Sequence, residues 1–219
     1  MSAERIDYVP PPDTGLEVLH VDEAMLVVNK PAGLLSVPGR GEDRQDCLAW
    51  RVQQRFADAL IVHRLDMATS GLLVMGRGAA MQRALSMAFE QRATDKRYEA
   101  VVHGLVAQDA GEIDLPLITD WPNRPRQMVC FGRGKPSLTR YRVIARDEAS
   151  HCTRVSLEPV TGRSHQLRVH LLALGHPIVG DELYAPASDA PRMMLHACAL
   201  SLSHPVSGCS MDWRSEAPF

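Results

Sequence analysis

A carboxylate and a guanidinium stand close together in residues 63–71 (HRLDMATSG). An ionised Asp66 can act as a nucleophile or a general base, and Arg64 can hold an anion or stack on a planar group. Apolar runs precede and follow this stretch, and Thr, Ser and Gly between such runs are typical of a turn between strands. Asp66 would then lie on a loop held by two buried elements, where catalytic side chains are common. Asp in a turn also commonly bonds its own backbone, and the residues alone favour that structural role.

The order of several short motifs along the chain is specific to one family. Residues 63–71 resemble the signature H-R-L-D-x-x-T-S-G of the RluA-type pseudouridine synthases, in which the Asp is the catalytic residue. Further motifs of that family have similar counterparts here, in the same order, in residues 28–34 (VNKPAGL), 96–98 (KRY), 162–170 (GRSHQLRVH) and 176–181 (HPIVGD). With residues 194–197 (MLHA), the resemblance extends over roughly residues 18–215.

The resemblance implies an isomerase that converts uridine in RNA to pseudouridine. This reaction breaks the C–N glycosidic bond, turns the uracil and reattaches it through carbon. It requires no redox partner and no energy source, so we expect no cofactor. A metal site is not indicated either, because His165 and His170 are five residues apart, with no acid nearby.

The resemblance assigns three catalytic residues, which are Asp66, Tyr98 and Arg168. In the family, the residue matching Arg168 pairs with the catalytic Asp. Such a cation keeps a carboxylate charged where burial would raise its pKa. The residue matching Tyr98 is expected to stack on the uracil and take the C5 proton. Pattern alone predicts a core tyrosine at Tyr98 and a surface helix position at Arg168.

A uridine inside a folded RNA loop must be extruded before a catalytic residue can reach it. Arg64, next to the catalytic residue, is expected to fill the vacated space, although pairing with a local carboxylate is an equal alternative. By resemblance Leu195 packs against the target base, which is compatible with a place in the core. His63 is expected to support the site or to stack, and not to act as the general base.

The distribution of charge along the chain indicates contact with RNA, although the net charge is −2. Between Trp121 and Arg146 there are seven basic residues and no acid, with Trp, Asn, Gln and Phe interleaved. Such a mixture combines phosphate contacts with stacking groups, whereas the alternative is a solvated face. The expected RNA-binding residues are Trp121, Asn123, Arg124, Arg126 and, in the fourth motif, Arg163.

Composition bounds the class of protein. The chain has 219 residues, of which 45% are hydrophobic and 23% charged, as in ordinary globular proteins. No secretory apolar region and no run of about 20 apolar residues is evident. The five cysteines are scattered without a C-x-x-C pair, which favours a reducing compartment. We expect a cytoplasmic protein, with no membrane partner and no DNA partner, that is a monomer.

Periodicity predicts an α+β fold with a mixed, largely antiparallel sheet and flanking helices, which is the fold that the resemblance implies. Helices are expected over 43–56 and 79–92 and from an N-cap at Ser164 to Gly175, and 109–120 is expected to be loop-like. Strands are expected over 26–28, 61–62, 72–75, 96–103, 137–144 and 153–157. Residues 1–17 should form an extended arm and 18–219 one catalytic domain, without room for an S4-type RNA-binding domain.

The short arm and residues 117–127 (LITDWPNRPRQ) resemble the dual-specificity branch of the family. That resemblance implies two substrates, uridine 32 in a tRNA anticodon stem-loop and uridine 746 in a 23S rRNA hairpin. One departure is Ala185, where many relatives have Gly after the Tyr. Two alternatives stay open, namely a family enzyme restricted to rRNA and an RNA-binding or RNA-folding protein whose site is incidental. A small-molecule lyase or hydrolase is disfavoured by the basic stretch.

Overall fold

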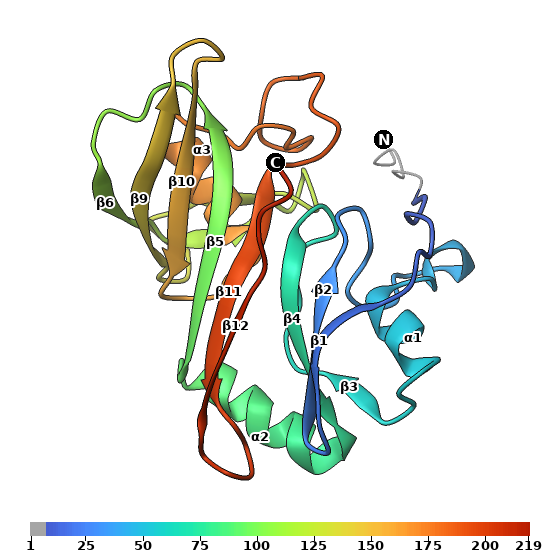
Figure 1. The fold of residues 1–219 in the computed structure, drawn as a ribbon. Coiled ribbons are helices and arrows are strands. Elements are labelled where there is room, and N and C mark those ends of the chain that lie inside the picture. Colours follow the sequence, from blue (N-terminus) through green and yellow to red (C-terminus); the bar gives the residue numbers. More distant parts are fainter. Residues whose placement is uncertain (1–7) are drawn as a thin grey trace. The chain divides into compact units, whose positions relative to one another are not determined.

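The computed structural model describes residues 8–219, which divide into two compact units (Figure 1). The first unit comprises residues 8–96 and 197–218, and the second comprises 97–196 and Phe219. The chain leaves the first unit within β5 (Thr94–His103) and re-enters it within β11 (Leu195–Ser203). Within the described residues, no helix is long and apolar enough to cross a membrane.

The first unit is built on strands in the order β1-β2-β4-β11. These are β1 (Glu17–Val21), β2 (Met25–Lys30) and β4 (Ser70–Arg77), with β3 (Ala59–Ile61) on β4 and β12 (Ser210–Arg214) on β11. β1–β2 and β2–β4 are antiparallel. The apolar runs of β2 and β4 are buried on both faces, as expected of central strands.

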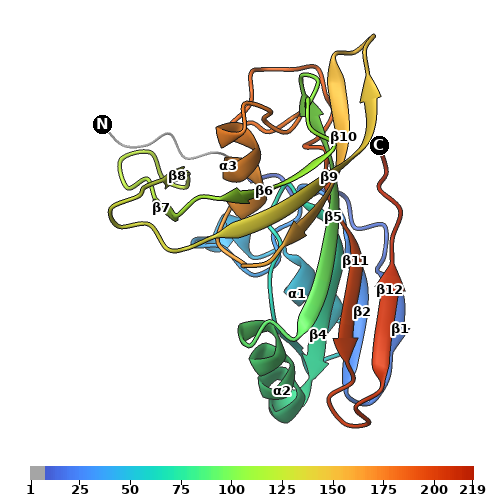
Figure 2. The ribbon, with the colours of Figure 1, turned by 90° about the vertical axis from the view of Figure 1, so that its left-hand side faces the viewer.

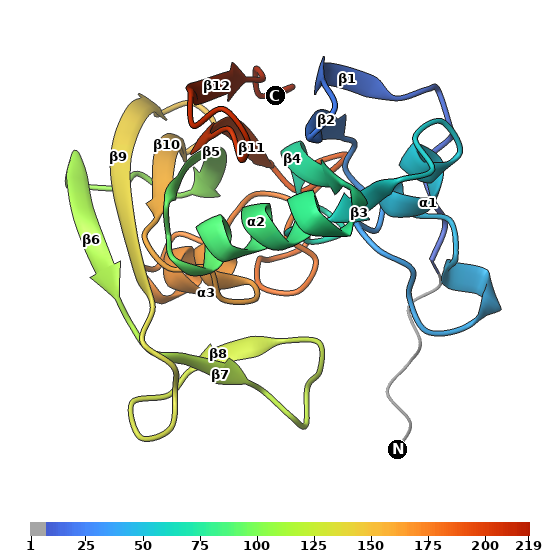
Figure 3. The same ribbon diagram turned by 90° about the horizontal axis from the view of Figure 1, so that it is seen from below.

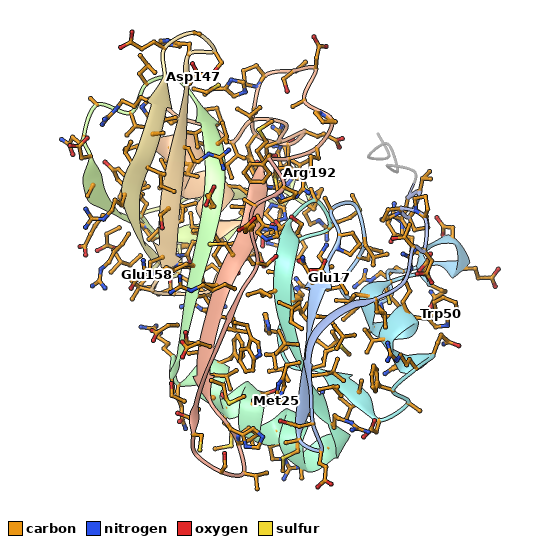
Figure 4. The ribbon with its side chains drawn as sticks, in the orientation of Figure 1. Glu17, Met25, Trp50, Asp147, Glu158 and Arg192 are labelled. Atoms are coloured by element: carbon orange, nitrogen blue, oxygen red, sulfur yellow. The ribbon has the colours of Figure 1, made fainter. Side chains whose placement is uncertain are left out.

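Three helices belong to the first unit: a 3₁₀ turn η1 (Glu42–Arg44), α1 (Leu48–Gln53) and α2 (Gly78–Glu90). Figure 3 shows α2 running alongside β3 and β4. Leu85 of α2 joins a core that includes Met25, Val74, Leu200 and Trp213, and Met25 is labelled in Figure 4. Burial of these apolar side chains fixes β4, the strand that begins at the end of the 63–71 segment.

The second unit has an antiparallel sheet in the order β5-β10-β9-β6 and a separate hairpin, β7–β8. Its elements are β6 (Ala110–Asp114), β7 (Leu117–Thr119), β8 (Gln127–Val129), β9 (Leu138–Asp147), β10 (Cys152–Pro159) and α3 (Gln166–Ala173). α3 is buried from Gln166 to Leu171, so it is a core helix with no solvent face over most of its length. Figure 2 shows the β7–β8 hairpin beside α3 and apart from β9 and β10.

Three expectations from the sequence were wrong. Residues 109–120 contain the short strands β6 and β7. Pairing with β9 and β8 defines these strands, and their own composition does not predict them. The helix expected over 43–56 is shorter, because η1 and a turn precede α1. The N-cap of α3 is His165 and not Ser164, and His165 has a left-handed backbone with φ of 53°. The α+β class itself is confirmed.

The described part of the N-terminal arm, residues 8–16, contains no helix or strand. Hydrogen bonds attach it to the first unit. The Tyr8 hydroxyl donates to the Asp46 carbonyl at 2.9 Å, and Arg51 Nη2 of α1 donates to the Pro11 carbonyl at 2.6 Å. The described part of the arm is therefore fixed by polar contacts to α1 and the residues before it. Residues 1–7 of the expected arm lie outside the described residues.

Candidate active site

Asp66 lies on a tight turn whose backbone is fixed on both sides. The Thr69 N–H donates to the Asp66 carbonyl at 3.1 Å, which closes the turn just before β4. Leu65 points into the protein and is buried, whereas Arg64 is exposed and Asp66 is half-buried. The alternation presents the guanidinium of Arg64 to solvent next to a carboxylate that is partly withdrawn from it.

A fully buried ammonium group braces this turn from below. Lys30, at the end of β2, has 0% exposure, and its Nζ donates to the carbonyls of Pro31, Leu34 and Met67 at 2.9, 2.6 and 3.0 Å. The Gly33 N–H donates to the same Met67 carbonyl at 2.9 Å. One buried ammonium group thus hydrogen-bonds to three backbone carbonyls in two loops and holds these loops together.

Ser36 supplies a second brace, on the other side of Asp66. Its Oγ donates to the Leu65 carbonyl at 2.7 Å and accepts from the Leu65 N–H at 3.1 Å. Ser36 is 4% exposed, so both bonds are shielded from water. The residues before and after Asp66 are thus held by side chains that precede them by 29 and 37 positions in the chain.

Lys30→Met should loosen the Asp66 turn, because three buried carbonyls lose a charged donor. We expect the free energy of unfolding to fall by about 2 kcal/mol and the catalytic rate constant to fall roughly tenfold. Urea unfolding and single-turnover kinetics measure the two effects. Arg83→Met, which removes an exposed cation from α2 of the same unit, is the matched control. Full stability and full activity in Lys30→Met would show that the brace is dispensable.

Gly71, which ends the 63–71 segment, permits close contact between two strands. Its φ is +117°, and a Cβ there would lie 2.4 Å from the Ala197 carbonyl oxygen and 2.5 Å from the Ala197 nitrogen. Any side chain would therefore push β4 away from β11, in addition to the strained backbone. The glycine of the signature is required by the packing of the strand that carries the turn.

His63 is held as a neutral ring. Its Nε2 accepts from the Val74 N–H at 3.1 Å, and its ring stacks on Phe89 at a centroid distance of 4.3 Å. Burial, with a smaller contribution from the charge of Lys96, lowers the pKa of His63 to about 3. Its acceptor nitrogen is already used by a backbone group, so this arrangement favours a supporting role over that of a general base.

The depressed pKa of His63 predicts how stability depends on pH. The folded-state pKa lies below the unfolded-state value of about 6.5, so His63 contributes stability that is fully present above that value. This contribution should decline as the pH falls from about 6.5 towards 3. In NMR spectra the His63 C2 proton should not titrate between about pH 8 and 5. A titration midpoint near the ordinary histidine value of about 6.5 would contradict the assignment.

Arg168 belongs to a buried ion pair within the second unit. Its Nε and Nη2 donate to Oδ2 and Oδ1 of Asp181, each at 2.7 Å, and the two side chains are 6% and 0% exposed. Asp181 Oδ1 also accepts from the N–H groups of Leu183 and Tyr184, at 3.0 and 3.2 Å. The surface position that pattern alone predicted for Arg168 was wrong, because α3 is a core helix. The guanidinium orientation is fixed by a two-pronged carboxylate.

Tyr98 and Leu195 lie on neighbouring backbone segments of the second unit. Tyr98 is half-buried on β5, opposite Leu157 of β10. Leu195 is 3% exposed at the start of β11, directly after Met194, whose carbonyl accepts from the Val101 N–H of β5 at 3.1 Å. The core environment of this strand face is compatible with both expected roles, because a stacking tyrosine also needs an apolar surrounding.

Four of the expected RNA-binding residues lie in the loop of the β7–β8 hairpin and are exposed, namely Trp121, Asn123, Arg124 and Arg126. Trp121 is 65% exposed, and the guanidinium carbon of Arg124 lies 4.5 Å from its ring centroid. Asn123 Nδ2 donates to Asp120 Oδ2 at 2.9 Å, which shapes the turn. Arg126 lies directly before β8 and is also exposed. A large exposed aromatic ring beside the Arg124 guanidinium, in a loop with a second arginine, is suited to stacking bases and holding phosphates.

The basic stretch is less uniform in space than in the sequence. Arg140 pairs with Glu112 of β6 and Glu158 of β10 at 2.9 and 3.3 Å, and Arg146 pairs with Asp109 at 2.7 Å. Figure 4 labels Glu158, which lies opposite Arg140 in the strand register. These two arginines therefore belong to ion pairs on the sheet surface. Contiguity in the sequence could not show this, because the acids lie outside the basic stretch, on β10 and on or just before β6.

Arg163 is exposed in the turn before α3, and its Nε donates to the Pro136 carbonyl at 3.3 Å. Its N–H donates to Gln166 Oε1 at 3.0 Å. The turn is thus tied to the loop that follows the β7–β8 hairpin. This places a further cation on the same unit as Trp121 and Arg124.

The functional residues that sequence reasoning missed are Lys30, Ser36 and Asp181. Lys30 and Asp181 lie within the family motifs at residues 28–34 and 176–181, but those motifs alone do not indicate their roles. Lys and Asp are seldom fully buried, so the residue types themselves argue against the buried positions that these two occupy. Ser36 carries no signal in its own surroundings, because its partner lies 29 positions further on.

Similarity to known proteins extends over nearly the whole chain. A family described as RNA pseudouridylate synthase matches residues 24–173. Dual-specificity RNA pseudouridine synthase RluA of Escherichia coli (strain K12) is 49% identical over 216 residues, which is 97% of this chain and 98% of the relative. The protein of that name from Yersinia pestis is 53% identical over 205 residues, 92% of this chain and 99% of the relative.

Solved structures are similar in fold. Human RNA Pseudouridylate Synthase Domain Containing 1 is 31% identical with a TM-score of 0.79, covering 96% of this chain and 87% of that one. Human RNA Pseudouridylate Synthase Domain Containing 4 has a TM-score of 0.72 at 24% identity, over 92% of this chain and 88% of that one, and shows a common fold. The described architecture is therefore shared with proteins carrying this name.

Proposed function

Because this chain belongs to the RNA pseudouridylate synthase family, we propose that it modifies uridines in two kinds of RNA. Membership of this family establishes the general activity: the chain is an RNA pseudouridine synthase, which is an isomerase. The proposed substrates are uridine 32 of a tRNA anticodon stem-loop and uridine 746 of a 23S rRNA hairpin. Support comes from relatives named dual-specificity enzymes, which this chain matches over 92% and 97% of its length.

Asp66 is proposed as the catalytic carboxylate. The observation that carries this assignment is the construction of its turn, which is braced by a fully buried lysine and a buried serine. A catalytic group must be held close to its productive position, and a turn fixed through its own carbonyls meets that need. An ordinary surface turn would not require a buried ammonium group beneath it.

In the proposed reaction the target uridine is extruded, and Arg64 takes the space that it leaves. Asp66 initiates cleavage of the bond between C1′ and N1. The detached uracil turns, C5 bonds to C1′, and the C5 proton is removed, with Tyr98 as its proposed acceptor. N1 gains a proton, so atoms balance without an oxidant or an added group. Arg168 supplies positive charge held by Asp181, and Leu195 packs against the base.

RNA binding is proposed to rest on the exposed hairpin of the second unit. Trp121 stacks on an unpaired base, while Arg124, Arg126 and Arg163 contact phosphates and Asn123 hydrogen-bonds to a base edge or phosphate. Loops of tRNA and rRNA offer such unpaired bases. No part of this scheme needs a cofactor.

The substrates can be tested on two transcripts, an anticodon stem-loop and a 23S hairpin. After incubation with the enzyme, carbodiimide labelling and primer extension should report pseudouridine at one position in each. Transcripts with cytidine at that position are the controls and should stay unlabelled. Reaction of the rRNA hairpin alone would favour the enzyme restricted to rRNA. Binding of both transcripts with modification of neither would leave the RNA-binding alternative.

A further inference from the structure

One tyrosine of the second unit connects the exposed hairpin to the helix that carries Arg168. The Tyr184 hydroxyl accepts from the Gln127 N–H at 2.7 Å and lies 2.8 Å from His165 Nδ1. Gln127 is the first residue of β8, and His165 is the N-cap of α3. Since the hydroxyl oxygen accepts from Gln127, its own proton is available to the imidazole nitrogen. A single hydroxyl therefore joins two elements that are far apart in the sequence.

The ring of Tyr184 makes a second set of contacts, with cations. The guanidinium carbon of Arg168 lies 5.0 Å from the ring centroid, and that of Arg126 lies 5.9 Å from it. The backbone of Tyr184 is held as well, because its N–H donates to Asp181 Oδ1. The ring thus contacts both Arg168, which is expected to act in catalysis, and Arg126, which is expected to bind RNA.

The backbone next to this contact is strained. His165 has a φ of 53°, a left-handed conformation that is uncommon for residues other than glycine. Such strain persists only where the surroundings hold it, and it is concentrated at functional sites. The bond to the Tyr184 hydroxyl and an edge-on ring contact with Tyr184 at 5.7 Å help to hold His165 here.

We propose that Tyr184 is a positioning residue that couples RNA contact at the β7–β8 hairpin to the placement of Arg168. The proposal rests on the function given above. The hydroxyl sets the position of β8 relative to the start of α3, and the ring supports the Arg168 guanidinium, which Asp181 also binds. The two parts of the side chain should therefore affect different steps of the reaction.

Two substitutions separate these parts. Tyr184→Phe keeps the ring and removes the hydroxyl, so the Kd for the anticodon stem-loop should rise about fivefold while the single-turnover rate constant stays within about twofold. Tyr184→Leu removes the ring as well, so the rate constant at saturating RNA should fall about tenfold or more. Fluorescence anisotropy gives Kd, and quenched single-turnover reactions give the rate constant. Tyr141→Phe, a buried tyrosine of β9, is the matched control and should change neither.

A double-mutant cycle tests the coupling without depending on Tyr184→Leu being folded. His165→Asn removes the imidazole but tolerates a left-handed backbone, and it should raise Kd about threefold. The double variant with Tyr184→Phe should bind no worse than Tyr184→Phe alone, since both changes break one connection. Fully additive effects on Kd would overturn the proposal. Wild-type Kd and rate constant in both Tyr184 variants, or an equal loss in Tyr141→Phe, would overturn it too.

Failure of the proposed function gives a different pattern. If the wild-type protein binds the stem-loop but forms no pseudouridine in either RNA, the substrate assignment fails. The Kd values of the cycle still report whether Tyr184 links the hairpin to α3. If the wild type is active and the cycle is additive, the function stands and the inference about Tyr184 is wrong.

Discussion

Asp66→Asn is expected to reduce the rate of pseudouridine formation by about a thousandfold or more, the range in which loss of a catalytic acid–base group falls. Asn has nearly the same shape but cannot act as a nucleophile or take a proton. The turn should survive the change, because its braces act through the carbonyls of Leu65 and Met67. The Kd for the anticodon stem-loop should therefore stay within about threefold of the wild-type value, since phosphate contacts dominate RNA affinity.

A matched control separates chemistry from a general loss of charge. Asp58→Asn removes a carboxylate of the same unit that pairs with Arg77 at 3.0 Å on the surface. Exposed pairs contribute about 1 kcal/mol or less, so this variant should retain activity within about twofold. Nucleoside analysis after digestion measures product in both variants. An active Asp66→Asn protein would show that Asp66 is a turn-former and that the catalytic group lies elsewhere.

Asp181→Asn is expected to have the second largest effect. It removes the carboxylate that holds Arg168 by two bonds of 2.7 Å in an environment where the Asp181 side chain is 0% exposed. Breaking a buried pair in this way typically lowers the free energy of unfolding by about 3 kcal/mol or more. The guanidinium also loses its fixed orientation, so the rate constant should fall well beyond what the loss of stability explains. Urea unfolding and single-turnover kinetics at a temperature where the variant is folded distinguish these effects.

Two further variants sharpen this result. Asp109→Asn breaks the exposed pair with Arg146 and should lower the free energy of unfolding by no more than about 1 kcal/mol. Arg168→Met combined with Asp181→Leu replaces the pair by apolar groups and should recover part of the lost stability while remaining inactive. Recovery is partial because the N–H groups of Leu183 and Tyr184 lose their acceptor. Equal destabilisation by Asp109→Asn and Asp181→Asn would contradict the special role of the buried pair.

Much of the fold was predictable, because apolar runs and the regular spacing of buried residues indicate strands and helices. The expected strands over 26–28, 72–75, 96–103 and 153–157 all lie within β2, β4, β5 and β10, and the helix over 79–92 corresponds to α2. Short edge strands such as β6 and the β7–β8 hairpin were missed, because pairing partners define them more than composition does. The cap of α3 was misassigned for a similar reason. Tertiary contacts hold His165 in a conformation that its own sequence does not favour.

The family and the enzyme class were also predictable, because several motifs in the order of the family form a specific signal although each motif alone is weak. The structure adds the supports of the motif residues. Lys30 stabilises the Asp66 turn through Met67, 37 positions away, and Asp181 fixes Arg168, 13 positions away. Neither distance matches a helical or strand period, so no local pattern could reveal these pairs. The same limit explains why Arg140 and Arg146 counted towards the basic stretch, although acids on and next to β6 pair with them.

Tritium release from an anticodon stem-loop labelled at uridine C5 tests the central claim most directly. Formation of pseudouridine replaces the C5 hydrogen by a bond to the sugar, so each turnover releases one tritium to water. The account predicts stoichiometric release by the wild-type protein and none above background by Asp66→Asn, with both proteins binding the RNA. Equal release by both proteins, or none by a wild-type protein that binds both RNAs tightly, would contradict it.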